Sequence, residues 1–126
     1  MVAKKLVYIA SPYAGNIEEN VGFARAACRY AVSEGMIPFA PHLIYPQVLD
    51  DAVPRERELG TMLGIRILKL CDELWLCGER LSEGMAREMA EARRLGIPVR
   101  RIGSGEIMEH KSAETPDPAR KGMSLC

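Results

Sequence analysis

Residues 71–99 read CDELWLCGERLSEGMAREMAEARRLGIPV, and this segment sets the fold class. DELWLCG, residues 72–78, is a short apolar run that predicts a buried strand. Ser82 can then cap a helix, and Gly96 can end it. IPVRRI, residues 97–102, predicts another strand. Because a helix joins the two strands, we expect them to be parallel neighbours.

The same alternation extends toward the N-terminus. Residues 5–11 and 36–40 predict strands, and a helix between them begins after Asn16 and ends at Gly35. A proline-rich loop, residues 41–54, leads into a helix that Pro54 can begin. The order predicts a small doubly wound α/β fold of the flavodoxin or Rossmann type. It has a parallel sheet of four to five strands with helices on both faces.

The predicted domain covers residues 1–102. Residues 103–126 are polar and rich in Pro, Gly and Ser, which predicts a tail that is mobile or strapped on a neighbouring subunit.

Composition excludes several classes of protein. The 126 residues carry 17 basic and 17 acidic side chains, so no net field favours a nucleic-acid polymer or an anionic membrane. No apolar run approaches the roughly 20 residues of a membrane span, and the apolar run at residues 6–10 is too short for that of a signal peptide. The four cysteines form no C-x-x-C pair and have no ligand spacing with the two histidines, so we expect no metal and a reducing, cytoplasmic location. Dinucleotide and P-loop signatures are absent, and no cofactor is expected.

The fold predicts a ligand crevice at the carboxyl ends of the strands. Three loops then matter, namely residues 11–16, 41–51 and 77–85. In the third loop, Ser82 and the free amides that follow it could bind an anion at a helix N-terminus. A plain helix cap is the alternative, and Glu83 favours it because its charge would repel a phosphate.

Glu88 is the most unusual residue of this helix. At about 100° per residue it lies on the apolar side, between Leu95 and Met85. A desolvated carboxylate there indicates either function or a buried pair, and pairing with Arg93 or exposure at the edge of the apolar side is the alternative. Tyr8, in the first strand, is ordinary core material, but its hydroxyl could bond to a carboxylate in the crevice.

Three segments, VYIASPYAGN, PFAPHLIYP and residues 71–99, together resemble a known superfamily. Across residues 5–102 they are similar to the nucleoside 2-deoxyribosyltransferases, and in particular to small DUF4406-type domains of unknown function. The resemblance implies a catalytic Glu88 oriented by Tyr8. It also implies a homo-oligomer, a dimer or tetramer, whose neighbouring subunits complete each site. The substrate-binding residues expected from the loops and the resemblance are Ser11, Pro12, Tyr13, Asn16, His42, Asp72, Ser82, Gly84 and Met85.

The chain also departs from that pattern. The superfamily has a second essential aspartate eight residues before the position of Asp72, where this chain has Gly64. Pro12 and Ala14 replace polar residues of the phosphate loop of the related nucleotide hydrolase.

Three functional hypotheses follow from these residues. The first is an N-glycosidase or deoxyribosyltransferase in which Glu88 attacks the anomeric carbon of a nucleoside or nucleotide. Asp72, Asp50 or Asp51 would then have to protonate the leaving base. The second is a nucleotide-binding module without catalysis, which Gly64 favours. The third is an interaction protein whose tail binds a partner.

Overall fold

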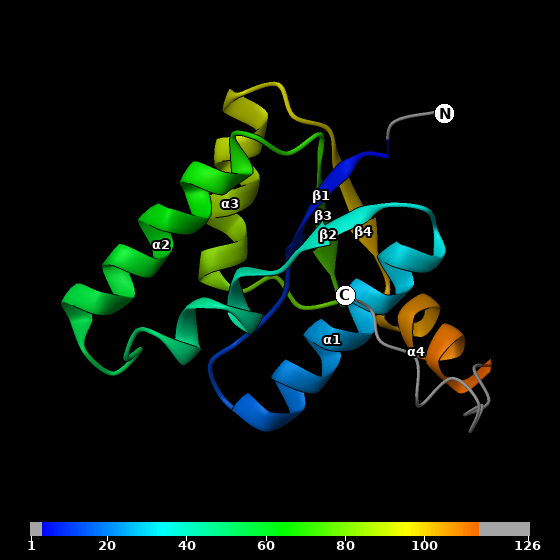
Figure 1. Ribbon diagram of the computed structural model, residues 1–126, viewed down its shortest axis with the longest axis horizontal. Helices are drawn as coiled ribbons and strands as arrows, with labels where there is room; N and C mark the ends of the chain where they lie inside the picture. Colours follow the sequence, from blue (N-terminus) through cyan, green and yellow to red (C-terminus); the bar gives the residue numbers. More distant parts are fainter. Residues whose placement is uncertain (1–3, 114–126) are drawn as a thin grey trace.

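The computed structural model describes residues 4–113 (Figure 1). Its four parallel strands form one sheet in the order β2-β1-β3-β4. The strands are β1 (Leu6–Ala10), β2 (Ile37–Phe39), β3 (Glu73–Cys77) and β4 (Val99–Ile102). The helices are α1 (Ile17–Ser33), α2 (Pro54–Leu68), α3 (Glu83–Arg94) and α4 (Ser104–Ala113), with the short 3-10 helices η1 (Pro41–Leu43) and η2 (Tyr45–Gln47). The predicted doubly wound α/β fold is confirmed.

The helices cover both faces of the sheet, with α2 and α3 on one face and α1 and α4 on the other (Figure 1). Successive side chains of a strand point to opposite faces, and β1, β3 and β4 accordingly contribute to both cores. On the α1/α4 face the core contains Val7, Ile9, Trp75, Cys77 and Ile107. On the α2/α3 face it contains Tyr8, Ala10, Leu74, Leu76 and Met85.

The strand order reverses between β1 and β3. Helix α1 leads from β1 to β2 on one side, whereas α2 returns the chain past β1 to β3 on the other. In doubly wound folds this reversal opens a crevice beyond the carboxyl ends of the two central strands. The loops after β1, β2 and β3 therefore meet at one end of the sheet.

Helices α1 and α3 begin at the side-chain caps that the sequence predicts. Asn16 accepts a hydrogen bond from the backbone N–H of Glu19 at 3.1 Å, and Ser82 accepts one from that of Met85 at 3.2 Å. Gly96 follows α3 with a φ of 73°, a left-handed conformation that glycine adopts at low cost.

Helix α4 differs from the predicted tail. Residues 104–113 are helical, and Ile107 is fully buried in the core of the α1/α4 face. The Ser104 backbone N–H and hydroxyl both donate to the carboxylate of Glu79. The start of the segment is thus folded onto the domain, and the rest of the predicted tail, residues 114–126, lies outside the described residues. In residues 4–113, no helix combines the length and the apolar character needed to cross a membrane.

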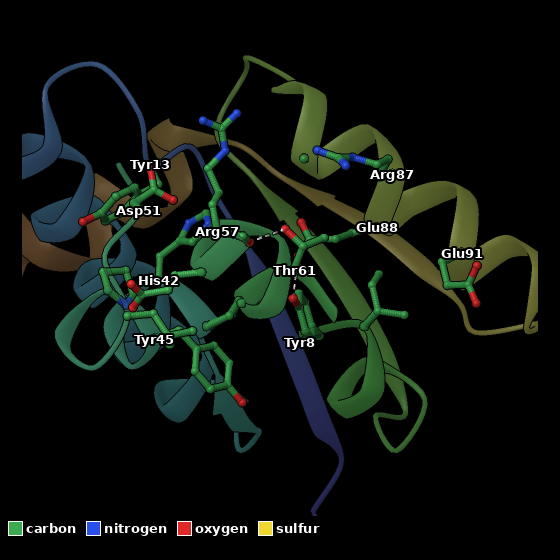
Figure 2. A pocket seen from close by; sticks show the side chains of 17 residues that line it. Tyr8, Tyr13, His42, Tyr45, Asp51, Arg57, Thr61, Arg87, Glu88 and Glu91 are labelled. Atoms are coloured by element: carbon green, nitrogen blue, oxygen red, sulfur yellow. Dashed lines mark hydrogen bonds between the residues drawn. The ribbon is translucent and has the colours of Figure 1, made fainter. Parts of the chain in front are cut away.

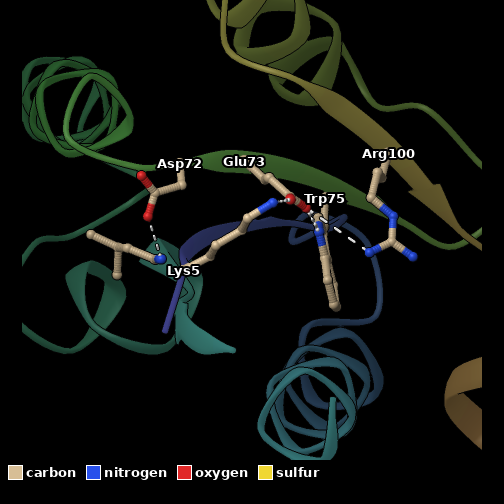
Figure 3. A network of polar contacts seen from close by, with 6 residues as sticks. Lys5, Asp72, Glu73, Trp75 and Arg100 are labelled. Atoms are coloured by element: carbon tan, nitrogen blue, oxygen red, sulfur yellow. Dashed lines mark hydrogen bonds and ion pairs between the residues drawn. The ribbon is translucent and has the colours of Figure 1, made fainter. Parts of the chain in front are cut away.

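A buried carboxylate joins β3 to β1 and β4 at the amino end of the sheet (Figure 3). Glu73 is 7% exposed and accepts hydrogen bonds from Lys5 Nζ and Trp75 Nε1, both at 2.9 Å. The guanidinium of Arg100 lies 3.9 Å from the same carboxylate and 4.9 Å from the centre of the Trp75 ring. The hydrogen bonds from Trp75 and Lys5 hold the pKa of Glu73 below its ordinary value.

We predict that Glu73→Gln destabilises the protein at neutral pH by about 1–2 kcal/mol, because residue 73 loses its negative charge. The loss stays moderate because the amide oxygen can still accept from Trp75. A carboxylate with a lowered folded pKa contributes stability that is present above its unfolded pKa and is lost as pH falls. The deficit of the variant should therefore shrink below pH 4.5, the ordinary value for this group. Urea unfolding at pH 7 and pH 3 measures both quantities.

Glu91→Gln is the matched control for this prediction. Glu91 pairs with Arg94 at the surface, where an ion pair contributes little to stability. An equal loss in both variants, or a Glu73→Gln deficit that is the same at both pH values, would contradict the account of the buried carboxylate.

Candidate functional site

A cavity of about 370 Å³ lies between α2, α3 and the loop that joins β2 to α2 (Figure 2). Tyr8 of β1 and Glu88 of α3 line it together with the loop residues His42 and Tyr45. The cavity is on the α2/α3 face, next to the point where the strand order reverses. The remaining lining residues are Tyr13, Pro41, Pro46, Leu49, Asp51, Glu56, Arg57, Gly60, Thr61, Ile65, Gly84, Arg87 and Glu91.

The central contact of the cavity joins Tyr8 to Glu88. The Tyr8 hydroxyl donates a hydrogen bond of 2.5 Å to Glu88 Oε2 (Figure 2). Tyr8 is 1% exposed, and Glu88 is partly buried. The sequence left open a pair between Glu88 and Arg93, but in the structure Glu88 is bonded to Tyr8 instead. A carboxylate is thus held at the wall of a cavity by a buried phenol.

This environment moves the titration of Glu88 toward neutrality. Burial raises its pKa to about 7, although the hydrogen bond from Tyr8 and the charge of Arg87 oppose the rise. Burial and the charge of Glu88 raise the pKa of Tyr8 well above its ordinary value, so its hydroxyl remains a donor. Near pH 7 the carboxyl of Glu88 therefore exists in both protonation states, a property found often at functional sites.

His42 and Tyr13 line the opposite side of the cavity from α3. Their ring centroids are 5.1 Å apart, a tilted aromatic contact. Burial lowers the pKa of His42, while the charge of Asp51 and a hydrogen bond to the backbone of Ser11 act in the other direction. The imidazole is thus mostly neutral at pH 7 and can act as a hydrogen-bond partner for a ligand.

Some charged side chains of the cavity have partners among the described residues, and others do not. Glu56 accepts from the backbone N–H of Asp50, and Glu91 is bonded to Arg94. Arg57 on α2 and Arg87 on α3 make no ion pair with any residue in the described part of the chain. These two guanidinium groups are available to a ligand (Figure 2).

The structure brings five of the predicted site residues together at this cavity. Two come from strand and loop segments before α1, one follows β2, and two belong to α3. They are Tyr8, Tyr13, His42, Gly84 and Glu88.

The remaining predicted residues lie elsewhere. Asp72 is at the amino end of β3, where it accepts from the backbone N–H of Leu6 at 2.8 Å, so it is remote from the carboxyl-end loops (Figure 3). Ser11 is buried, and its hydroxyl has no hydrogen-bond partner among the described residues. Pro12 borders a second hollow beside α1 and α4. Asn16 and Ser82 serve as helix caps, and Met85 is buried in the core.

The sequence did not identify several residues that line the cavity from α2 and α3. Arg57, Gly60, Thr61 and Ile65 recur at helical spacing on α2, as do Arg87 and Glu91 around Glu88 on α3. Their helical spacing is visible in the sequence. It identifies them as cavity residues only when the structure shows which face of α2 turns toward Glu88.

Comparison with known proteins establishes the family. Residues 5–102 match the model of the family described as Domain of unknown function (DUF7768), and the chain belongs to this family. The DUF4406-type subfamily suggested by the resemblance is therefore not confirmed. No curated protein is significantly similar to the chain.

A solved structure shows the same fold. The chain is similar to a 2-deoxyribosyltransferase from the psychrotolerant bacterium Bacillus psychrosaccharolyticus, with a TM-score of 0.63 and 20% sequence identity. The match covers 76% of this chain and 70% of the other. The protein thus has a fold like that of the 2-deoxyribosyltransferases.

The raised pKa of Glu88 has a consequence for stability that needs no ligand. A carboxyl whose folded pKa is raised contributes stability that is present below its unfolded pKa and lost as pH rises to about 7. We predict that Glu88→Gln, which does not ionise, gains about 1–3 kcal/mol relative to wild type between pH 4.5 and pH 8. Denaturant unfolding at several pH values measures the difference.

Glu91→Gln, one turn further along α3, is the control. The hydrogen bond from Arg94 lowers the pKa of Glu91, so this substitution should produce no such gain at high pH. A stability difference between Glu88→Gln and wild type that does not vary with pH would show that Glu88 titrates normally.

Proposed function

We propose that the protein cleaves the N-glycosidic bond of a nucleoside or nucleotide, as an N-glycosidase or a deoxyribosyltransferase. The observation that carries the proposal is the Tyr8–Glu88 pair at the wall of a cavity of about 370 Å³, which is within the usual size range of small-molecule sites. The fold, shared with a 2-deoxyribosyltransferase, adds support. The partner is a small molecule rather than a nucleic-acid polymer.

Glu88 is the nucleophile in this proposal. Its ionised carboxylate attacks the anomeric carbon through an oxocarbenium-like transition state, while the bond from that carbon to the base nitrogen breaks. A covalent glycosyl-enzyme forms, and water or a second base releases the sugar from Glu88. Tyr8 donates to one carboxylate oxygen, Oε2, and so orients the other oxygen toward the substrate.

The departing base needs a proton, and the cavity narrows the choice of donor. Of the three aspartates considered from the sequence, only Asp51 lines the cavity. Asp72 is at the other end of the sheet, and Asp50 accepts from the backbone N–H of Ala52 in a turn. We therefore assign Asp51 as the general acid.

The enzyme is further proposed to act in the cytoplasm as a homo-oligomer, a dimer or tetramer. Exposed apolar side chains on α2 support association, since Leu59, Met62 and Leu63 are 43%, 64% and 37% exposed.

We predict that wild type releases free base from a panel of ribo- and deoxyribonucleosides and their 5′-monophosphates, and that Glu88→Gln lowers this rate at least roughly a thousandfold. The loss follows because an amide cannot form the glycosyl ester. Chromatography of the released base measures the rate. Glu83→Gln, an exposed change in the first turn of α3 outside the cavity, should leave the rate unchanged.

A nucleotide-binding module without catalysis is the second candidate, and Gly64 at the position of the superfamily aspartate favours it. The same panel separates the two. Ligands that raise the melting temperature of wild type while no base is released would support the module, and a ligand at a hundred times its Kd adds about 2.7 kcal/mol to the stability. Base release at equal rates by wild type and Glu88→Gln would contradict the assigned nucleophile.

A further inference from the structure

Helix α2 passes very close to Tyr8, and the contact involves a residue with no side chain. A Cβ atom built on Gly64 would lie 2.7 Å from the Tyr8 hydroxyl oxygen, a separation that real Cβ atoms do not adopt. The next nearest atoms, Pro41 Cβ and Tyr8 Cζ, are 3.9 Å away, which is ordinary van der Waals contact. The conflict is therefore confined to one atom, the oxygen that donates to Glu88.

We infer that Gly64 is a positioning residue, whose missing side chain leaves the space in which the Tyr8 hydroxyl reaches Glu88. The hydroxyl lies between α2 and α3, bonded to Glu88 on one side and facing bare backbone on the other. Its importance for catalysis rests on the proposed function, but the geometric role of Gly64 does not.

Tyr8 has little freedom to avoid a larger residue at position 64. It is 1% exposed and sits in the middle of the central strand β1. Its ring is 5.9 Å from the ring of Phe39 on the neighbouring strand. A side chain at position 64 must therefore displace α2 or push the hydroxyl away from Glu88 Oε2, since a close-packed interior yields only by such shifts.

The displacement would change the chemistry of Glu88. Within the described part of the chain, Tyr8 gives the Glu88 carboxylate its only hydrogen bond, and this bond favours the ionised form. Without it, burial would act against the charge of Arg87 alone, and less of the carboxyl would be ionised at neutral pH. Gly64 thus keeps Glu88 available as a nucleophile.

Any side chain at position 64, an acid included, would place its Cβ 2.7 Å from the Tyr8 hydroxyl unless that oxygen or α2 shifted, so glycine fits the observed Tyr8–Glu88 geometry. The short hydrogen bond from Tyr8 to Glu88 thus uses space that the absence of a side chain at Gly64 leaves open. The proton for a leaving base then has to come from another part of the cavity.

A double-mutant cycle tests this arrangement without any substrate. Gly64→Ala should lower the denaturant midpoint of wild type, although alanine normally favours a helix over glycine. In the Tyr8→Phe background, which lacks the clashing oxygen, the same substitution should leave the midpoint unchanged or raise it. Equal losses in both backgrounds would overturn the inference.

Gly60→Ala provides the matched control on the same helix. Its added Cβ would meet Leu49 Cδ1 at 3.5 Å, an ordinary contact, so it should not lower the midpoint in either background. If Gly60→Ala is as damaging as Gly64→Ala, the effect comes from α2 in general and not from the Tyr8 hydroxyl.

Titration of the Glu88 carboxyl by carbon-13 NMR gives a readout that a purely structural role would not move. Gly64→Ala should raise the pKa of Glu88 above its wild-type value, and Gly60→Ala should not change it. An unchanged pKa in Gly64→Ala would contradict the positioning role, even if base release were found. The other charged or titratable groups that line the cavity are the same in both variants, namely Tyr13, His42, Tyr45, Asp51, Glu56, Arg57, Arg87 and Glu91.

Discussion

The hydrogen bond from Tyr8 to Glu88 is the contact on which the site depends. It links the middle of β1 to α3 across the core of the α2/α3 face, so it forms only when α3 is packed on the sheet. The surrounding apolar layer desolvates the carboxyl and raises its pKa, whereas the phenol supplies the compensating donor. The packing that stabilises the domain therefore also sets the protonation of Glu88.

The sequence was sufficient for the elements that follow simple local rules. Apolar runs placed the four strands, and Asn16, Ser82 and Gly96 marked helix ends through capping. Glu88 stood out because a carboxylate interrupted an apolar face. Helix α4 was missed because, among residues 104–109, Ile107 is the one buried side chain in a mostly polar segment.

The parts of the site that the sequence could not predict depend on tertiary geometry. Asp72 opens a strand, but strand position alone did not show that it lies at the end of the sheet away from the cavity. In the sequence, Gly64 favoured a binding module without catalysis, whereas the space that it leaves beside the Tyr8 hydroxyl supports the positioning role that we infer. The inferred role depends on the closeness of α2 to β1. This closeness arises from side-chain packing and not from periodicity.

Peptide mapping by mass spectrometry, after incubation with 2-fluorinated deoxynucleosides and their 5′-monophosphates, tests the central claim most directly. Fluorine at C2 of the sugar destabilises the oxocarbenium-like transition state and slows the breakdown of a glycosyl-enzyme, so that the intermediate accumulates. The account predicts the mass of one fluorinated sugar on the peptide that contains Glu88, at that residue alone. A sugar on another carboxylate of the cavity, such as Asp51 or Glu91, or base release that leaves the chain unmodified, would contradict it.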